Sequence, residues 1–173
     1  MCSEDRINKA DINNNLNEKG GSMVKPEVLK KQILLEDLDN EGLKKIAGII
    51  KRMSLKKGEY LFKEKDDTSG IYLLNTGKVE ITRVTPDGWR QTLVVLTPGH
   101  FFGELSIFEK RQHVASAVAA EDTDLFLIPR GEFEKLTEED MTLAFNIIKK
   151  IAIVMSKNLR RMTDKFLSAL ISY

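Results

Sequence analysis

Cysteine is almost absent from this chain of 173 residues, which has a single one, Cys2, in a polar stretch near its start. One thiol cannot build the disulfide framework of a small secreted protein, and no apolar run follows Cys2 as it would in a signal peptide or a lipid-attachment signal. Apolar runs of the roughly 20 residues that a membrane helix needs are also lacking. We therefore expect a cytoplasmic protein that does not associate with membranes.

An excess of charge of one sign is lacking as well, because 27 basic residues balance 26 acidic ones and leave a net charge of +1. No overall field would draw such a protein onto nucleic acid or an anionic bilayer. Histidine is scarce, with only His100 and His113 in the sequence. Nor does any serine or cysteine stand in a nucleophile-and-base arrangement for acyl transfer. The sequence thus predicts no catalytic residues, no metal site and no cofactor.

The chain divides into four ranges that differ in composition and in the spacing of apolar residues. Residues 1–22 have the polar, aperiodic composition of a disordered leader. Residues 23–56 predict N-terminal helices, with Asp39 as the N-cap of the second. Residues 57–130 consist of short alternating runs between turn residues, which predict an all-β sandwich or barrel. Residues 131–173 predict a short helix and then a long one, capped by Thr137 together with Asp140.

The β region divides into strands and turns. Alternating apolar residues predict strands at 60–62, 71–74, 79–84, 91–96, 115–119 and 125–128. Glycine and Asx residues at 75–78 and 85–88 are typical of tight reversals, and we expect each of these turns to close a hairpin.

The long C-terminal helix carries two apolar stripes. One recurs at alternating steps of four and three and forms a heptad seam of Ile148, Ala152, Met155, Leu159, Met162, Phe166, Ala169 and Tyr173. A second stripe, at Ile147, Ile151 and Val154, lies beside it. We predict that one stripe docks on the β region and that the other forms a homodimer through residues 148–173. The alternative is a single amphipathic helix folded back on its own core.

The most informative motif is the run of residues 101–108, followed after a basic loop by the run 115–119. Gly103 and Glu104 open a short helical turn, whose backbone N–H groups can bind an anion while the carboxylate accepts from a hydroxyl. This pattern resembles the phosphate-binding cassette of cyclic-nucleotide-binding domains, as in catabolite activator proteins, over roughly residues 38–165. The resemblance implies a mainly β fold of Crp-Fnr type, a double-stranded β-helix (jelly roll or β-roll) with N-terminal helices and a long C-terminal dimerisation helix.

The resemblance also implies a ligand pocket for cyclic AMP, cyclic GMP or another small phosphate-bearing molecule. Its expected lining is Phe102, Gly103, Glu104, Leu105, Ser106, His113, Val114 and Ala115, with Thr163 at a lid and Val79, Ile81 and Leu93 as possible apolar walls. Gly103 would let the backbone approach the phosphate, Glu104 would bind a ribose hydroxyl, and Leu105 and Ser106 would offer backbone N–H groups.

This chain departs from the family where an arginine normally contacts the phosphate, because His113 or Val114 stands there. Imidazole lacks the two parallel donors and the permanent charge of a guanidinium, and it carries a proton only below about pH 6.5. Lys110 and Arg111 lie in the same loop and could fold inward, or they could remain in solvent.

Three functions are compatible with these observations. The first is a stand-alone sensor or regulatory module that couples ligand in the β-roll to a dimer helix. The second is a degenerate roll that binds no cyclic nucleotide and serves as a dimerisation or interaction scaffold. The third and least favoured is a cupin-like metal enzyme using His100 and Glu104. Because the winged helix-turn-helix of related transcription factors does not follow the long helix, we expect no direct DNA binding.

Overall fold

The computed structural model describes residues 24–109 and 111–171. The predicted leader at 1–22, Lys110 and the last seam residue, Tyr173, lie outside these ranges. The elements are α2 (Pro26–Leu29), α3 (Asn40–Ile49), β1 (Lys51–Leu55), β2 (Tyr60–Phe62), β3 (Gly70–Thr76), β4 (Val79–Val84), β5 (Arg90–Leu96), β6 (Phe101–Phe102), the 3-10 helix η1 (Glu104–Ile107), β7 (Ser116–Ala119), β8 (Thr123–Pro129), α4 (Arg130–Glu139) and α5 (Met141–Ile171).

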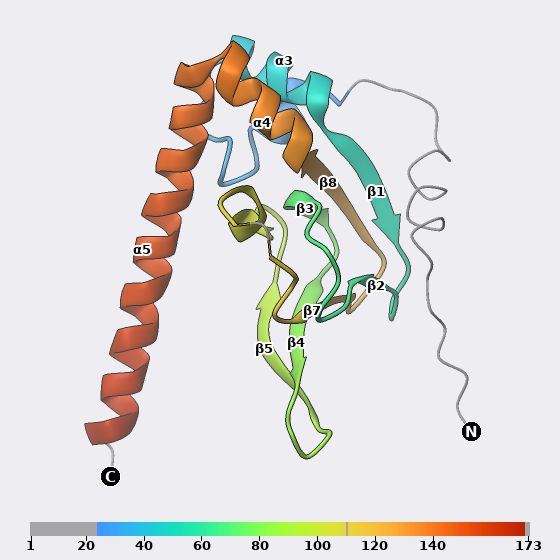
Figure 1. The fold of residues 1–173 in the computed structure, drawn as a ribbon, viewed down its shortest axis with the longest axis vertical. Coiled ribbons are helices and arrows are strands. Elements are labelled where there is room, and N and C mark those ends of the chain that lie inside the picture. The colour runs from blue at the N-terminus through green and yellow to red at the C-terminus, as the bar shows by residue number, and fades with distance from the viewer. Residues whose placement is uncertain (1–23, 110, 172–173) are drawn as a thin grey trace.

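Within the described ranges the strands form two four-stranded antiparallel sheets (Figure 1), in the orders β1-β8-β3-β6 and β2-β7-β4-β5. Helices α3 and α4 lie at one end of the roll, and α5 runs along its side. The predicted mainly β fold, with N-terminal helices and a long C-terminal helix, is confirmed.

Alternation along β3 explains how the two layers hold together. Tyr72 and Leu74 point into the core between the sheets, whereas Ile71 and Leu73 point to the opposite face. That opposite face packs against the helices, including Ile147 of α5, and all four β3 side chains are at most 3% exposed. Because successive side chains of a strand face opposite sides, one short segment fills both cores.

Capping residues set where the helices begin. Asp39 accepts a hydrogen bond from the Gly42 backbone N–H at 2.8 Å, which confirms it as the N-cap of α3. Helix α5 is capped differently from the prediction, since Asp140 accepts from the Leu143 backbone N–H at 3.0 Å. Thr137 instead donates to the Glu134 carbonyl inside α4. Asp140 takes the role because it directly precedes α5.

Two further expectations were wrong. Residues 51–55 form strand β1, paired with β8, although the range 23–56 was assigned to helices. The turn at 75–78 closes no hairpin, because β3 and β4 belong to different sheets and Gly77 carries the chain from one to the other. A Cβ at Gly77 would lie 2.5 Å from the Asp122 carbonyl oxygen, so this crossing needs glycine. The turn at 85–88 does close the β4–β5 hairpin.

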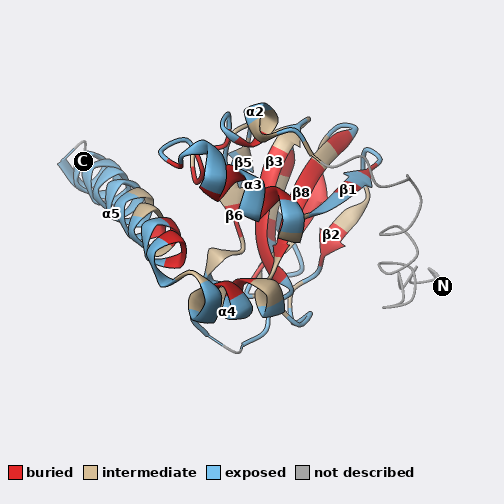
Figure 2. Cartoon of the chain, turned by 90° about the horizontal axis from the view of Figure 1, so that it is seen from above, coloured by how far each residue is buried: buried red, intermediate tan, exposed pale blue. Residues whose placement is uncertain are grey.

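Helix α5 changes character along its length. Its first turns bury Leu143, Ala144, Ile147 and Ile151, and beyond them the helix is largely exposed, as the pale blue of Figure 2 shows. In the described part of the chain, no helix combines the length and apolarity needed to cross a bilayer.

Candidate functional site

A cavity of about 220 Å³ lies between strand β2, helix η1 and the loop that leads into β7. It brings together all the predicted pocket residues except Thr163: Phe102, Gly103, Glu104, Leu105, Ser106, His113, Val114 and Ala115. Of the expected apolar walls, Ile81 lines the cavity, whereas Val79 is buried in the core and Leu93 lies on the outer surface of β5.

Thr163 does not reach this cavity. It lies on the exposed part of α5, and its hydroxyl donates to the Leu159 carbonyl of its own helix at 3.0 Å. The sequence placed Thr163 at the lid by likeness to a family helix. Within one protomer, α5 packs on the roll only through its first turns, so the role of Thr163 toward a ligand stays a prediction.

Gly103 makes the turn between β6 and η1 possible. Its φ is 76°, in the left-handed region, and a Cβ would lie 2.9 Å from the Gly70 carbonyl oxygen and 3.0 Å from Cδ2 of Tyr72. The backbone therefore passes close to β3, and only glycine fits there. The expected close approach to a phosphate is not needed to explain this glycine.

The backbone N–H of Ser106, which the resemblance assigns to a ligand, is already hydrogen-bonded within η1, so its role toward a ligand stays a prediction. This N–H donates to the Gly103 carbonyl at 3.0 Å, which closes the first turn of η1. The side chain is different. Ser106 is 1% exposed, and within the described residues its hydroxyl oxygen has no hydrogen-bond partner. A buried hydroxyl without a partner destabilises the fold, so a ligand group that pairs with it would be stabilising.

Glu104 places a carboxylate in the cavity. Burial raises the pKa of this carboxyl, and a hydrogen bond from its own backbone N–H opposes the shift only in part. The charged form is therefore less favourable here than in water. A donor from a ligand, such as a hydroxyl, would compensate for the lost hydration.

His113 serves as a wall of the cavity. Its ring stacks on that of Phe62, with centroids 3.5 Å apart and planes inclined by 4°. Its backbone N–H donates to the Asp66 carbonyl at 2.9 Å, and its carbonyl accepts from the Lys65 N–H at 2.8 Å. Burial lowers the pKa of His113, although the nearby charge of Asp66 opposes this. Protonation of this imidazole thus needs a more acidic solution than the expected titration near pH 6.5.

The two remaining loop residues differ in what they offer. Val114 is 57% exposed and has no donor. Arg111 lines the cavity, and its Nε–H donates to Oε2 of Glu109 at 2.8 Å. Among the described lining residues, Glu104 supplies the one carboxyl group and Arg111 the one guanidinium.

Sequence reasoning missed Phe62, Thr68 and Gln112, which also line the cavity. They reach it because residues 65–67 pair with residues 112–113, through the His113 contacts and a β-bridge between Asp67 and Gln112. Neither segment has a sequence pattern from which this pairing could be predicted. Of the three residues, only Phe62 could have been proposed from the sequence, because it is a large apolar residue at the end of a predicted strand.

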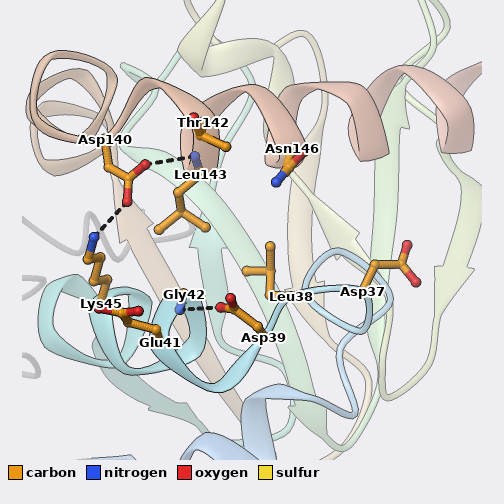
Figure 3. Close-up of a pocket in the computed structure, with 10 residues that line it drawn as sticks. All are labelled: Asp37, Leu38, Asp39, Glu41, Gly42, Lys45, Asp140, Thr142, Leu143 and Asn146. Carbon is orange, nitrogen blue, oxygen red and sulfur yellow. Dashed lines mark hydrogen bonds and ion pairs between the residues drawn. The ribbon is translucent and has the colours of Figure 1, made fainter.

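A second cavity, of about 250 Å³, lies between α3 and α5 (Figure 3). Three of its four carboxylates already have structural partners. Asp39 caps α3, Asp140 both caps α5 and pairs with Lys45 at 2.7 Å, and Asp37 pairs with Lys150 at 2.6 Å. Most of the acidic groups of this cavity therefore serve to hold the helices together. The described residues also contain no group of three or more His, Cys, Asp and Glu side chains that could hold a metal ion.

Comparison with known protein families gives a match to the cyclic nucleotide-binding domain over residues 52–140, just over half of the 173 residues. The chain belongs to this family. The matched range contains the eight strands of the described fold, apart from the first residue of β1, and the whole lining of the cavity.

Individual relatives agree with this assignment. The cyclic AMP receptor protein of Thermus thermophilus is 31% identical over 124 residues, which are 72% of this chain and 57% of that protein. The crystal structure of the Thermus thermophilus catabolite activator protein superposes with a TM-score of 0.68 at 29% identity, over 80% of this chain and 63% of that one. A cyclic nucleotide-binding domain from Methylobacillus flagellatus gives a TM-score of 0.74 at 20% identity and shows the same fold over 82% of this chain and 84% of its own.

The chain spans about half the length of the curated relatives that it matches. The functions of the remaining parts of those proteins are therefore not assigned to this chain. The shared part is a regulatory β-roll of the Crp-Fnr type.

Proposed function

We propose that this chain is a regulatory module that binds a small phosphate-bearing ligand, cyclic AMP or cyclic GMP in the first place, in the β-roll cavity and passes the signal to α5. The observation that carries the proposal is Glu104. Its carboxylate shares the cavity with Ser106, and burial disfavours the charged form of Glu104 while the Ser106 hydroxyl has no partner among the described residues. A ribose hydroxyl could donate to the carboxylate, and a phosphate oxygen could accept from the serine.

A path from the cavity to α5 runs through η1. This helix contacts both β3 and α4, and α4 contacts α5. Ile107, the last residue of η1, packs against the apolar cluster that also contains Ile147 and Ile151 of α5. A ligand that stabilises one arrangement of η1 would therefore bias the position of α5.

The readout that we propose is pairing of α5 with α5 of a second copy. Met155, Leu159, Met162 and Phe166 follow one another at steps of four, three and four and are 39%, 67%, 67% and 65% exposed. Such a row is the seam of a two-stranded coiled coil. In the described protomer nothing covers it, whereas a second helix would bury it. The cytoplasmic location remains a prediction.

Titration calorimetry with cyclic AMP and cyclic GMP at pH 6 and pH 7.5 tests ligand binding. We expect saturable binding that Glu104→Ala abolishes and that the control Glu132→Ala, an exposed acid on α4 paired with Lys135, leaves unchanged. No heat from either nucleotide at millimolar concentration would refute the ligand part of the proposal.

Sedimentation equilibrium tests the dimer. We expect a dimer for the native chain, a monomer for Leu159→Glu in the seam, and a dimer for Lys157→Glu, which places the same acid at a polar exposed position of α5. A native chain that sediments as a monomer at all concentrations, with and without nucleotide, would refute α5 pairing.

A second function, a dimerisation scaffold without nucleotide binding, is favoured by one observation. Val114 offers no side-chain donor, and the His113 ring stacks on Phe62 where burial lowers its pKa, so neither residue provides the permanent charge and paired donors of the family arginine. A dimer that binds neither nucleotide would support this function.

A further inference from the structure

We propose that Arg111 binds the phosphate of the ligand in this cavity and that Glu109 competes for Arg111 in the ligand-free protein. This inference rests on the proposed function, because it names the residue that recognises the anionic part of the same ligand.

The charges around the cavity point to Arg111. An anion entering beside the Glu104 carboxylate needs a cation nearby, since two negative groups in a partly buried space repel each other. Of the described lining residues, only Arg111 carries a permanent positive charge. Val114 has no side-chain donor, and the His113 ring, which stacks on Phe62, carries no permanent charge, although its buried Nε2 has no partner among the described residues.

The contacts of Arg111 leave donors available for a phosphate. Its pair with Glu109 uses the Nε–H, and a guanidinium has four further N–H donors on its two Nη atoms. Both side chains of this pair are about half exposed, at 52% and 51%. Exposed ion pairs contribute little to stability, so exchange of the Glu109 carboxylate for a phosphate is feasible.

The backbone beside Arg111 is anchored. Gln112 forms a β-bridge with Asp67, and the His113 N–H donates to the Asp66 carbonyl. The arginine side chain therefore starts from a fixed point on the rim, which lowers the entropy lost when it closes on a ligand.

A second, independent group favours the same anion. Ser106 lines the cavity, is 1% exposed, and has a hydroxyl without a partner among the described residues. This hydroxyl can donate to a phosphate oxygen while Glu104 accepts from a sugar hydroxyl. The lining thus suits a ligand that has a phosphate next to a hydroxyl, rather than an anion alone.

The test measures cyclic AMP affinity by calorimetry at pH 7.5 in 50 mM and 500 mM salt. The variants are Arg111→Gln, Arg111→Lys and Glu109→Gln. The matched control is Arg52→Gln, which removes another exposed arginine paired with a carboxylate, Asp124, on β1 away from the cavity. Thermal melts of each variant verify folding, which the exposure of these side chains should preserve.

We expect Arg111→Gln to lower the affinity at 50 mM salt by tenfold or more and Arg111→Lys to lower it less, because lysine keeps the charge but not the fork of donors. Glu109→Gln should raise the affinity two- to fivefold, and Arg52→Gln should leave it unchanged. High salt should weaken binding by the native chain and have little effect on Arg111→Gln, a readout that a merely structural role would not change.

The outcomes separate the two proposals. If Glu104→Ala abolishes binding while Arg111→Gln binds like the native chain, the cavity binds nucleotide and the role of Arg111 is refuted. Unchanged or weaker binding by Glu109→Gln would refute the competition. If the native chain binds no nucleotide at millimolar concentration, the proposed function fails and this inference fails with it.

Discussion

Replacing Gly103 with alanine should destabilise the protein through two effects that the structure separates. At φ 76°, a Cβ clashes with its own backbone, which costs about 1–2 kcal/mol. That Cβ would also lie 2.9 Å from the Gly70 carbonyl oxygen and 3.0 Å from the Tyr72 ring, both in the well-packed β3. Overpacking of this kind costs about 1–3 kcal/mol. We expect Gly103→Ala to lower the free energy of unfolding by about 2–5 kcal/mol in total.

Two other glycines provide matched controls. Gly88 has nearly the same φ, 84°, and a Cβ there would meet nothing within 4 Å, so Gly88→Ala should show the conformational effect alone, about 1–2 kcal/mol. Gly131 lies in helix α4, also with open space and without a positive φ. Gly131→Ala should be neutral or stabilise by up to about 1 kcal/mol.

Urea unfolding followed by circular dichroism measures all three, with linear extrapolation of the free energy and comparison of the slopes. The difference between Gly103→Ala and Gly88→Ala isolates the close approach to β3. If Gly103→Ala destabilises no more than Gly88→Ala, η1 does not pack on β3 as described, and the assignment of this glycine to the fold rather than to the ligand is wrong.

Three further predictions concern the site and the core. Because burial raises the pKa of Glu104, the unfolded chain ionises more readily, so Glu104→Gln should stabilise the protein at pH 7 and lose that advantage below pH 4.5, as melts across pH would show. Because burial lowers the pKa of His113, the unfolded chain binds the proton first, so melting temperatures should fall as pH drops below 6.5, and less steeply in His113→Asn. Ile147→Ala, at a side chain 0% exposed, should lower the urea-derived unfolding free energy by about 2–5 kcal/mol, whereas Ile153→Ala, 42% exposed, should lower it by under about 1.

Much of the β-roll was predictable because its strands must face two cores. The run Ile71 to Leu74 is apolar at every position, since β3 is covered on both faces, and such a run is recognised as a strand from sequence. Strand β1 was not predicted, because it comes directly after α3 and begins with two basic residues. Only Met53 and Leu55 show the alternation that its pairing with β8 buries.

Long-range placement explains the remaining differences. Nothing in a turn sequence tells whether Gly77 reverses the chain within one sheet or carries it into the other, because both need a positive φ. The position of Thr163 depends on how far α5 follows the roll, and that is set by Ile151 being the last buried residue of the helix. The lining residues at 102–106 and 113–115 could be predicted because they belong to the recognised motif. Phe62 and Thr68 could not, because they reach the cavity from a distant part of the chain.

Some residues of the motif are required by the fold, and others are not. Gly103 is required by its φ and by its contact with β3, and Ala115 is 7% exposed in the packed roll. A chain can therefore keep these residues without binding anything. Glu104 has no such structural reason, because burial makes its charged form unfavourable. Its carboxylate gains from a ligand donor what it loses in the ligand-free protein, so occupancy should raise stability with ligand concentration. A scaffold with no ligand would be more stable with glutamine at this position, and that is why Glu104, rather than the glycine beside it, distinguishes a sensor from a scaffold.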